Sequence, residues 1–273
     1  MPTKSSSEQG ENAYAEAGHP FGLSIEGEGP PLLLVPGMDG TGRLFYKQVP
    51  LLSRHFRVGT FRLPDDAHHL DTMVAAVVEV VQAMSPSGEP VIVCGESFGG
   101  AMSLSLAARH PELVRALVIL NSFSRFLPQH RLHAAVASLS VMPWGMMALV
   151  RRLTAFRMHS RFTHRAELRR FLHETRATTR EGYLNRLRIL MEYDARPHLA
   201  NLPMPVLFLA ADQDHLIPSV EQAEYMVSRV PRGSLRVLEG HGHVCLIAPN
   251  VDLAEILLSW EHLGVGPGEG RAV

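Results

Sequence analysis

The stretch that most constrains this chain is Pro-Val-Ile-Val-Cys-Gly-Glu-Ser-Phe-Gly-Gly, at residues 90–100. The β-branched apolar run at 91–93 predicts a buried strand, and residues 100–108 predict a helix. Gly-x-Ser-x-Gly between a strand and a helix is typical of a nucleophile elbow, a strained turn that exposes its serine, here Ser97. A plain glycine-rich turn with an ordinary serine is the alternative interpretation.

The three glycines of this stretch are explained by lack of space. We expect Ser97 to have a positive φ, with strand and helix passing close together on either side of it. Side chains at positions 95, 99 and 100 would then collide with their neighbours, which glycine avoids. Ser97 would lie at the N-terminus of the helix, where free N–H groups and the positive end of the dipole favour a developing oxyanion.

Strand and helix signals alternate along most of the chain. We expect an edge strand within 22–27 and further strands at 32–35, 58–63, 91–93, 114–120, 206–210 and 235–238. Helices are expected at 71–84, 100–108, 219–230 and 251–263. This alternation predicts an α/β fold, with a mostly parallel central sheet and helices on both faces.

The chain is predicted to divide into a core and an insertion. Helical stretches without strand signal fill residues 125–199, which we interpret as a helical cap, or lid, inserted into a core formed by 19–124 and 200–263. The polar residues 1–18 are expected to be a disordered tail, and the glycine-rich residues 264–273 a flexible one.

Composition excludes several classes of function. The formal net charge of the 273 residues is −1, which argues against nucleic-acid binding. The chain has no run of 18 apolar residues, so no membrane span is expected. The N-terminus lacks an apolar signal core, so we expect a cytoplasmic protein. Cys94 and Cys245 lie in apolar runs and are expected to be buried free thiols, with no metal site.

Ser97 needs a base to take its proton and an acid to orient that base. In an open parallel sheet the working residues follow the carboxyl ends of strands. Asp212 and Asp214 follow the strand predicted at 206–210, and His241 and His243 follow the one at 235–238. The order along the chain is therefore Ser, Asp, His.

With this order and these motifs, the chain resembles the α/β-hydrolase superfamily from about residue 23 to residue 263. The resemblance rests on residues 36–42 (Pro-Gly-Met-Asp-Gly-Thr-Gly), 95–100, 212–218 and 240–249. The 36–42 loop and the elbow are similar to an esterase-like bacterial branch, and plant phytyl ester synthases carry a related loop in their hydrolase domains. Many members have a histidine where this chain has Pro36.

The resemblance implies roles for particular residues. It favours Asp214 as the acid, because an apolar pair and a proline follow at 216–218, and His243 as the base, because Gly242 precedes it. Asp212, as a turn cap, and His241 remain alternatives for these two roles. The oxyanion donors are expected to be the backbone N–H groups of Phe98 and Met38, whose side chains would line the acyl pocket.

Two features of residues 125–199 each allow two interpretations. The apolar side chains there are either the packing face of a cap helix or a Met-rich wall for an acyl chain. They are Met142, Trp144, Met146, Met147, Leu149, Val150, Leu153 and Phe156. The segment also carries 14 arginines against five acidic residues, a net +9. This is either a solvated face or a landing surface for an anionic partner: acyl carrier protein, coenzyme A or an anionic lipid surface.

Together these residues predict a serine hydrolase that cleaves a small carboxylic ester through an acyl-enzyme, with no cofactor or metal. A thioesterase or an acyltransferase would use the same three side chains. A non-catalytic protein that binds a small molecule in the same fold is the alternative from another class.

Overall fold

The computed structural model describes residues 19–263 of the chain, apart from the side chains of residues 155–157. The tails predicted at 1–18 and 264–273 lie outside the described residues. Seven strands form one sheet in the order β1-β3-β2-β4-β5-β6-β7. They are β1 Ser24–Glu26, β2 Pro31–Val35, β3 Arg57–Thr60, β4 Val91–Glu96, β5 Val114–Leu120, β6 Val206–Ala211 and β7 Gly233–Leu238.

The sheet is parallel except at one edge. Only β1 runs antiparallel, against β3, and every other neighbouring pair of strands is parallel. The prediction of a mostly parallel sheet with an edge strand near residue 25 is therefore confirmed. Parallel pairing also brings the carboxyl ends of β2, β4, β5, β6 and β7 to one edge of the sheet.

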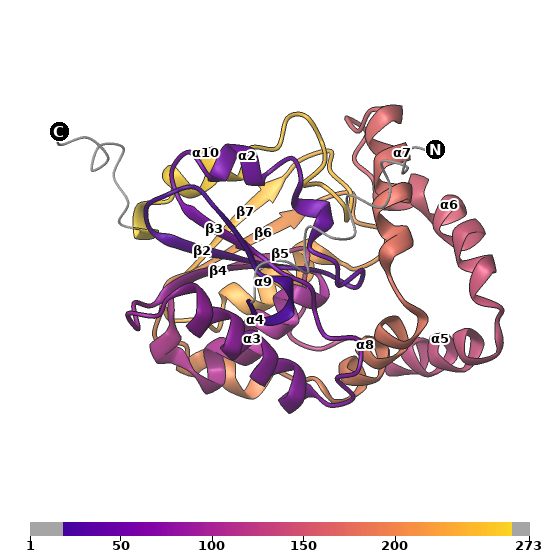
Figure 1. Ribbon diagram of the computed structural model, residues 1–273, viewed down its shortest axis with the longest axis horizontal. Coiled ribbons are helices and arrows are strands. Elements are labelled where there is room, and N and C mark those ends of the chain that lie inside the picture. The colour runs from indigo at the N-terminus through magenta and orange to yellow at the C-terminus, as the bar shows by residue number, and fades with distance from the viewer. Residues whose placement is uncertain (1–18, 264–273) are drawn as a thin grey trace, which may run out of the picture.

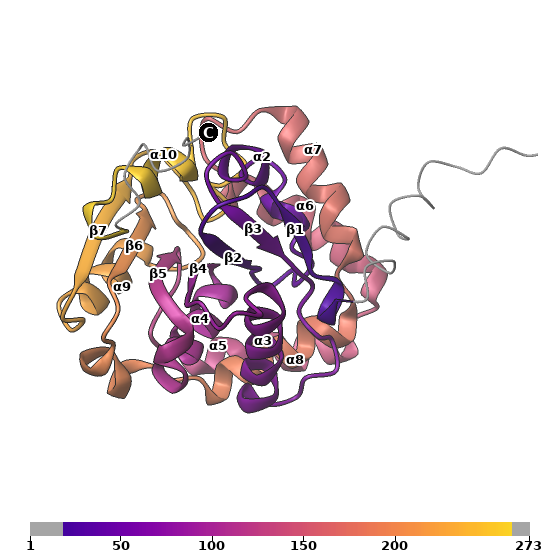
Figure 2. The ribbon, with the colours of Figure 1, turned by 60° about the vertical axis from the view of Figure 1, so that its left-hand side comes forward.

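Helices cover both faces of the sheet, as Figures 1 and 2 show. Helices α3 (Leu70–Met84), α4 (Phe98–Arg109) and α9 (Ser219–Val227) lie on one face, and α2 (Val49–Leu52) and α10 (Leu253–Leu258) on the other. Side chains along a strand alternate between the faces, so Val91 and Val93 enter one core and Ile92 and Cys94 the other.

The last helix is shorter than the predicted 251–263. The carboxylate of Asp252 accepts a hydrogen bond from the Glu255 N–H and so caps the start of α10. After Leu257 the hydrogen bonds change to the 3-10 type, because the Trp260 N–H donates to the Leu257 carbonyl three residues back. A 3-10 turn then covers Glu261–Leu263.

Four helices follow β5 and lie to one side of the sheet, on the right of Figure 1. They are α5 (Gln129–Val141), α6 (Met147–Met158), α7 (Arg165–Glu174) and α8 (Arg180–Glu192). Glu167 of α7 joins them to the loop after β2, since it pairs with Lys47 Nζ at 3.0 Å and accepts a hydrogen bond from the Tyr46 hydroxyl. Within residues 19–263, no helix is long and apolar enough to cross a membrane.

Candidate active site

Ser97 stands in the strained turn between β4 and α4. Its φ is 54° and its ψ is −116°, so the predicted positive φ is confirmed. The Ser97 N–H donates to the Leu120 carbonyl at 2.9 Å, and the Ser122 hydroxyl donates to the Ser97 carbonyl at 2.6 Å. The end of β5 thus holds the turn from both sides of the serine peptide.

The glycines around Ser97 occupy positions where a side chain would collide. A Cβ atom at Gly99 would lie 2.1 Å from the Val35 carbonyl oxygen, and one at Gly95 would lie 2.3 Å from the Gly99 carbonyl oxygen. A Cβ atom at Gly100 would lie 2.5 Å from Cβ of Ser122. The sequence-based explanation of all three glycines is therefore confirmed.

The structure brings Ser97, His243 and Asp214 together from the ends of three strands. His243 Nε2 lies 3.0 Å from Ser97 Oγ, and His243 Nδ1 lies 2.7 Å from Asp214 Oδ2. The other carboxylate oxygen of Asp214 accepts hydrogen bonds from the Leu216 and Ile217 N–H groups, at 2.9 and 3.0 Å. This places the imidazole between a hydroxyl and a fixed carboxylate.

The surroundings of Asp214 and His243 shift the pKa values of both side chains. Burial alone would raise the pKa of Asp214, but the hydrogen bond and positive charge of His243, with bonds from Ser219 and Ile217, hold it below its usual value. Burial alone would lower the pKa of His243, but the hydrogen bond and charge of Asp214, and the charge of Glu96, raise it. The carboxylate therefore favours the protonated imidazole that forms during proton transfer.

The alternative candidates lie elsewhere. Asp212 is exposed and accepts a hydrogen bond from the Gly240 N–H at 2.6 Å, which is the turn-capping role considered for it. His241 is buried against Phe162, with Nε2 3.3 Å from the Asn250 side-chain amide. Neither side chain makes a hydrogen bond with Ser97 or His243.

Glu96 is a buried carboxyl beside Ser97 that the sequence analysis did not single out. It lines the same cavity as Ser97 and His243, and its Oε1 has no hydrogen-bond partner among the described residues. Burial raises its pKa to about 7, with Asp39 and Asp214 adding to the shift and His243 opposing it. The signal was visible, because a glutamate at the end of an apolar strand must either be paired or titrate.

Asn121 ties three strand ends together and was also missed as a functional residue. It has a φ of 44°, a conformation that asparagine tolerates better than most residues. Its Nδ2 donates to the His243 carbonyl and its Oδ1 accepts from the Ala211 N–H, both at 2.8 Å. The loop that carries His243 is thereby fixed to β5 and β6.

The two backbone groups predicted as oxyanion donors belong to Met38, in the loop after β2, and to Phe98, the residue after Ser97. In the described part of the chain, the N–H groups of Met38 and Phe98 donate no hydrogen bond to another protein group. The Phe98 N–H is the first of helix α4, a position that has no partner within the helix. Both groups are therefore available to a ligand, as the prediction requires.

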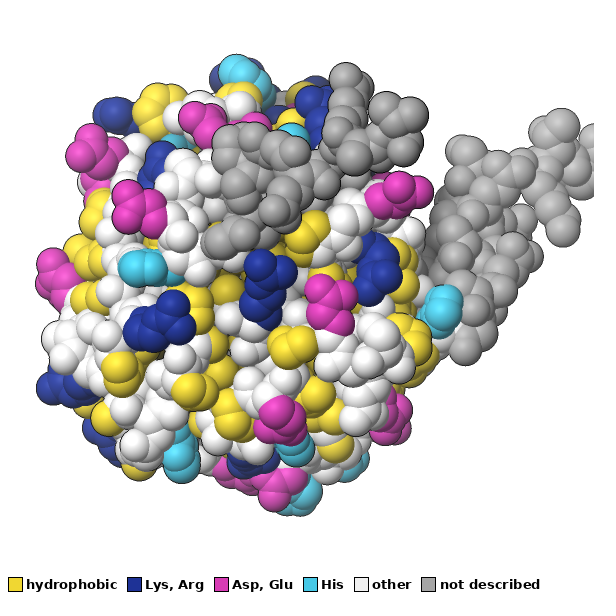
Figure 3. Space-filling view, turned by 90° about the vertical axis from the view of Figure 1, so that its left-hand side faces the viewer, with side chains coloured by type: hydrophobic (Ala, Val, Ile, Leu, Met, Phe, Trp, Pro, Cys, Tyr) yellow, Lys and Arg dark blue, Asp and Glu magenta, His cyan; other side chains and the backbone are white. Residues whose placement is uncertain are grey.

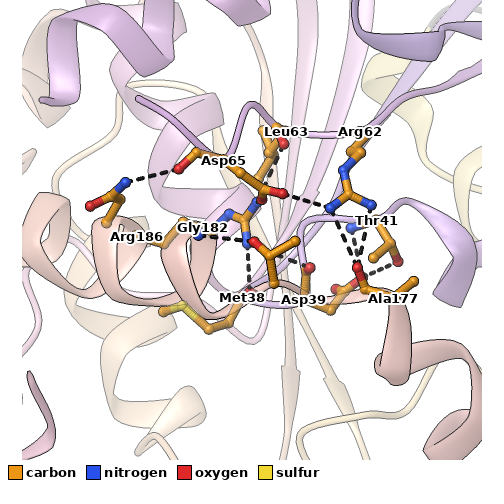
Figure 4. A network of polar contacts seen from close by, with 11 residues as sticks. Met38, Asp39, Thr41, Arg62, Leu63, Asp65, Ala177, Gly182 and Arg186 are labelled. Atoms are coloured by element: carbon orange, nitrogen blue, oxygen red, sulfur yellow. Dashed lines mark hydrogen bonds and ion pairs between the residues drawn. The ribbon is translucent and has the colours of Figure 1, made fainter. Parts of the chain in front are cut away.

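A buried arginine from α8 holds the loop that carries Met38 (Figure 4). Arg186 pairs with Asp65 at 2.7 Å and also donates to the carbonyls of Met38 and Leu63, at 3.4 and 3.3 Å. Its guanidinium stands so close that a Cβ atom at Gly40, whose φ is +69°, would lie 2.2 Å from it. The loop thus takes its shape partly from a helix more than a hundred residues away in the sequence.

Ser97, His243 and Met38 line a cavity of about 380 Å³. The expectation that the Phe98 side chain lines it is wrong, because that side chain is not part of the cavity wall and is fully buried in the hydrophobic core. A strained turn that aims Ser97 outward directs the next side chain inward.

The proposed Met-rich wall is only partly correct. Of its eight residues, Met147 and Val150 line the cavity, and Met158, which was not predicted, joins them. Met146, Leu149 and Leu153 are exposed instead, since they lie on the outer side of α6 and its leading turn. Met142 and Trp144 do not line the cavity, and the side chain of Phe156 lies outside the described residues.

Comparison with known proteins identifies the family. A family model described as the alpha/beta hydrolase fold matches residues 30–248. The chain belongs to this family. The hydrolase is 29% identical to a Serratia proteamaculans protein named "Putative carbamate hydrolase RutD", over 85% of this chain and 90% of that one. It is 28% identical to a pimeloyl-[acyl-carrier protein] methyl ester esterase of Xanthomonas campestris, over 86% of this chain and 96% of that one.

Solved structures agree at the level of the fold. A hydrolase from Oleispira antarctica superposes with a TM-score of 0.75 at 14% identity, covering 89% of this chain and 95% of that one. Within residues 19–263 of the present hydrolase, no group of three or more His, Cys, Asp or Glu side chains is arranged to hold a metal ion.

Proposed function

We propose that this hydrolase cleaves carboxylic esters through an acyl-enzyme formed on Ser97. The observation that supports the proposal is the pair of His243 contacts, 3.0 Å to Ser97 Oγ and 2.7 Å to Asp214 Oδ2. A serine hydroxyl is activated as a nucleophile when it is hydrogen-bonded to an imidazole that is itself hydrogen-bonded to a carboxylate. The methyl ester esterase named among the relatives supports the choice of an ester.

In the proposed reaction, Ser97 Oγ attacks the acyl carbon while its proton passes to His243 Nε2. Asp214 holds the ring through Nδ1 and stabilises the imidazolium. The N–H groups of Met38 and Phe98 bind the oxyanion of the tetrahedral intermediate. His243 then gives its proton to the departing alcohol. A water molecule, deprotonated by the same imidazole, attacks the acyl carbon of the acyl-enzyme. The bond from the acyl carbon to Ser97 Oγ breaks, His243 returns the proton to Oγ, and the acid leaves.

The test is turnover of p-nitrophenyl esters of graded acyl length, together with labelling of Ser97 by a fluorophosphonate. We expect cleavage of at least the short esters and stoichiometric labelling that Ser97→Ala abolishes. A protein that binds these esters without turnover and without label would be a binding protein of the same fold, which would overturn the proposal.

The same three side chains would also serve a thioesterase or an acyltransferase. Adding a primary alcohol as a competing acceptor separates transfer from hydrolysis, because an acyltransferase forms a new ester in preference to the free acid. Oxygen esters and thioesters of the same acyl group distinguish an esterase from a thioesterase. We expect the free acid as the main product, and the oxygen ester as the better substrate.

A further inference from the structure

The cavity that contains Ser97 has a second group of polar side chains, separate from those used in the proposed reaction. Arg151 of α6 and Thr178, just before α8, both line it. Apolar side chains of Met147, Val150 and Phe171 line the cavity as well. The cavity therefore combines a reactive centre, an apolar wall and a cationic group.

Arg151 has donor capacity that the protein does not use. Its Nη1 donates to the Thr175 carbonyl at 2.5 Å, and its guanidinium carbon lies 5.5 Å from the centroid of the Trp144 ring. Its Nη2 is buried and has no hydrogen-bond partner, and no carboxylate of residues 19–263 forms an ion pair with it. A buried guanidinium donor without an acceptor is costly, so a ligand that supplies one is favoured.

Thr178 presents a second unused donor in the same cavity. The residue is 3% exposed, and its hydroxyl has no partner among the described residues. The other two threonines of the cavity wall differ, since Thr154 and Thr175 donate their hydroxyl hydrogens to the carbonyls of Val150 and Phe171. Arg151 and Thr178 thus each bring to the wall a buried donor that is still able to bind an oxygen anion.

Two acidic side chains, Asp39 and Glu96, share the wall of this cavity with Arg151. Asp39 interacts electrostatically with Arg151 but forms no ion pair with it, and its Oδ2 accepts hydrogen bonds from the N–H and the hydroxyl of Thr41, at 2.9 and 2.5 Å. Glu96 lies beside Ser97 and has a pKa raised to about 7 by burial, so it is only partly charged at neutral pH. Among the described residues, no other carboxylate lines the cavity.

We infer that this cavity takes an ester that carries a carboxylate away from its scissile bond, with Arg151 and Thr178 receiving that carboxylate. The inference rests on the proposed function for the ester and adds the class of the substrate. Arginine suits the role because a planar guanidinium makes charge-assisted hydrogen bonds to a carboxylate, and the threonine hydroxyl adds a further donor. An acyl chain without charge would leave these donors unpaired.

The experiment compares matched esters. Monomethyl esters of straight-chain dicarboxylic acids of four to eight carbons are set against methyl esters of fatty acids with the same carbon number. We expect kcat/KM to favour the acidic ester at one or two chain lengths. Acetate esters of ω-hydroxy acids, which carry the carboxylate on the alcohol side, show which half of the substrate faces Arg151.

Variants assign the preference to the side chain. Arg151→Gln should lower the ratio of kcat/KM for the acidic ester to that for the neutral ester by about 10- to 100-fold, and Arg151→Lys should restore part of it. Thr178→Val should lower the ratio by a smaller factor. Arg152→Gln is the matched control, because Arg152 is the neighbouring, exposed arginine of α6, and it should leave the ratio unchanged.

Binding to the Ser97→Ala variant keeps the inference separate from the proposed reaction. The acidic monomethyl ester should bind about 10- to 100-fold more weakly when Arg151→Gln is added, whether or not any ester is cleaved by the wild type. Loss of turnover with this binding difference intact would overturn the proposed function alone. The inference alone would be overturned if both ester classes are cleaved and Arg151→Gln changes neither the acidic-to-neutral ratio of kcat/KM nor the affinity for the acidic ester.

Discussion

At the scale of single residues, the contacts of His243 distinguish two carboxylates and two histidines that are close in sequence. His243 contacts both Asp214 and Ser97, whereas Asp212 accepts a hydrogen bond from a backbone N–H and His241 lies beside Asn250. Residues of a triad act as a unit, so removing any one member removes most of the rate enhancement.

The first prediction follows from this difference. Ser97→Ala should lower kcat for a p-nitrophenyl ester by about 10⁴- to 10⁶-fold, and Asp214→Asn and His243→Ala should each have effects of similar order. Asp212→Asn and His241→Ala are the paired controls and should cost far less. A larger loss at Asp212 or His241, measured on the same ester, would reverse the assignment of the acid or the base.

The second prediction concerns pH. His243 must be neutral to accept the serine proton, and its pKa is raised above the usual 6.5 by Asp214 and Glu96. Activity should therefore fall as the pH drops through a value above 6.5, and kcat/KM should show an acid limb there. Glu96→Gln removes a negative charge that favours the imidazolium, so the limb should move to lower pH.

The control for this shift is Glu239→Gln, which changes a carboxyl outside the cavity that holds Ser97. It should leave the acid limb in place. Because Glu96 itself has a pKa of about 7, the wild-type limb belongs to the coupled pair rather than to one group. An acid limb that does not move in Glu96→Gln would remove Glu96 from the titration that controls activity.

At the scale of elements, helix α8 and the loop after β2 depend on each other. Arg186 is fully buried and joins α8 to the carbonyls of Met38 and Leu63 and to the carboxylate of Asp65. Asp65 is shared with Arg62, whose Nη2 donates to it at 2.6 Å. The Met38 N–H, proposed to bind the oxyanion, is therefore positioned by a side chain that does not line the cavity.

The third prediction tests this coupling. Arg186→Met should lower the free energy of unfolding by on the order of 2 kcal/mol, since it removes several charge-assisted hydrogen bonds from a buried site. It should lower kcat more than it raises KM, because an oxyanion donor out of place weakens binding of the transition state in particular.

Arg188→Met is the matched control, since Arg188 is the nearby, exposed arginine of α8. Its kinetics and its free energy of unfolding, measured by denaturant titration, should stay close to those of the wild type. If Arg186→Met destabilises the protein but leaves kcat unchanged below its melting temperature, Arg186 supports the fold without positioning the loop.

At the scale of the whole molecule, charge is unevenly distributed. Residues 125–199 carry a net +9 in a chain of net −1, while the face shown in Figure 3, turned away from α5 to α8, mixes both signs. Several of the 14 arginines are engaged within the protein: Arg186 is buried, Arg125 and Arg196 pair with Asp194, and Arg170 covers the Tyr46 ring. The attractive surface is therefore smaller than the count suggests.

The fourth prediction applies if the exposed arginines recruit an anionic carrier. Such attraction raises the encounter rate and is screened over about 8 Å at physiological salt. The kcat/KM for an acyl-carrier-protein or coenzyme A substrate should fall steeply with added salt, while that for a neutral p-nitrophenyl ester stays nearly flat.

Charge reversal locates the effect. Arg165→Glu combined with Arg169→Glu changes two exposed arginines of α7 and should slow only the anionic substrate. Arg170 is a poorer choice, because its guanidinium lies 3.6 Å from the centroid of the Tyr46 ring. An equal salt response for both substrates would mean that these arginines form a solvated face.

The sequence by itself determined the sheet, the elbow and the order of a serine, an aspartate and a histidine along the chain. These features are local: β-branched runs form strands, and glycines at 95, 99 and 100 are needed wherever a strand turns sharply into a helix. Parallel strands then bring their carboxyl ends to one edge without further information.

Only the tertiary structure decided which of the paired candidates meet, and what lines the cavity. Arg186 and Met38 are 148 residues apart, and Asn121 and His243 are 122 apart. No periodicity in the chain reports such contacts, because they join segments that only the tertiary fold brings together. Likewise, only the structure shows that Phe98 is buried, that Glu96 Oε1 has no partner among the described residues and that Arg151, rather than Arg152, lines the cavity.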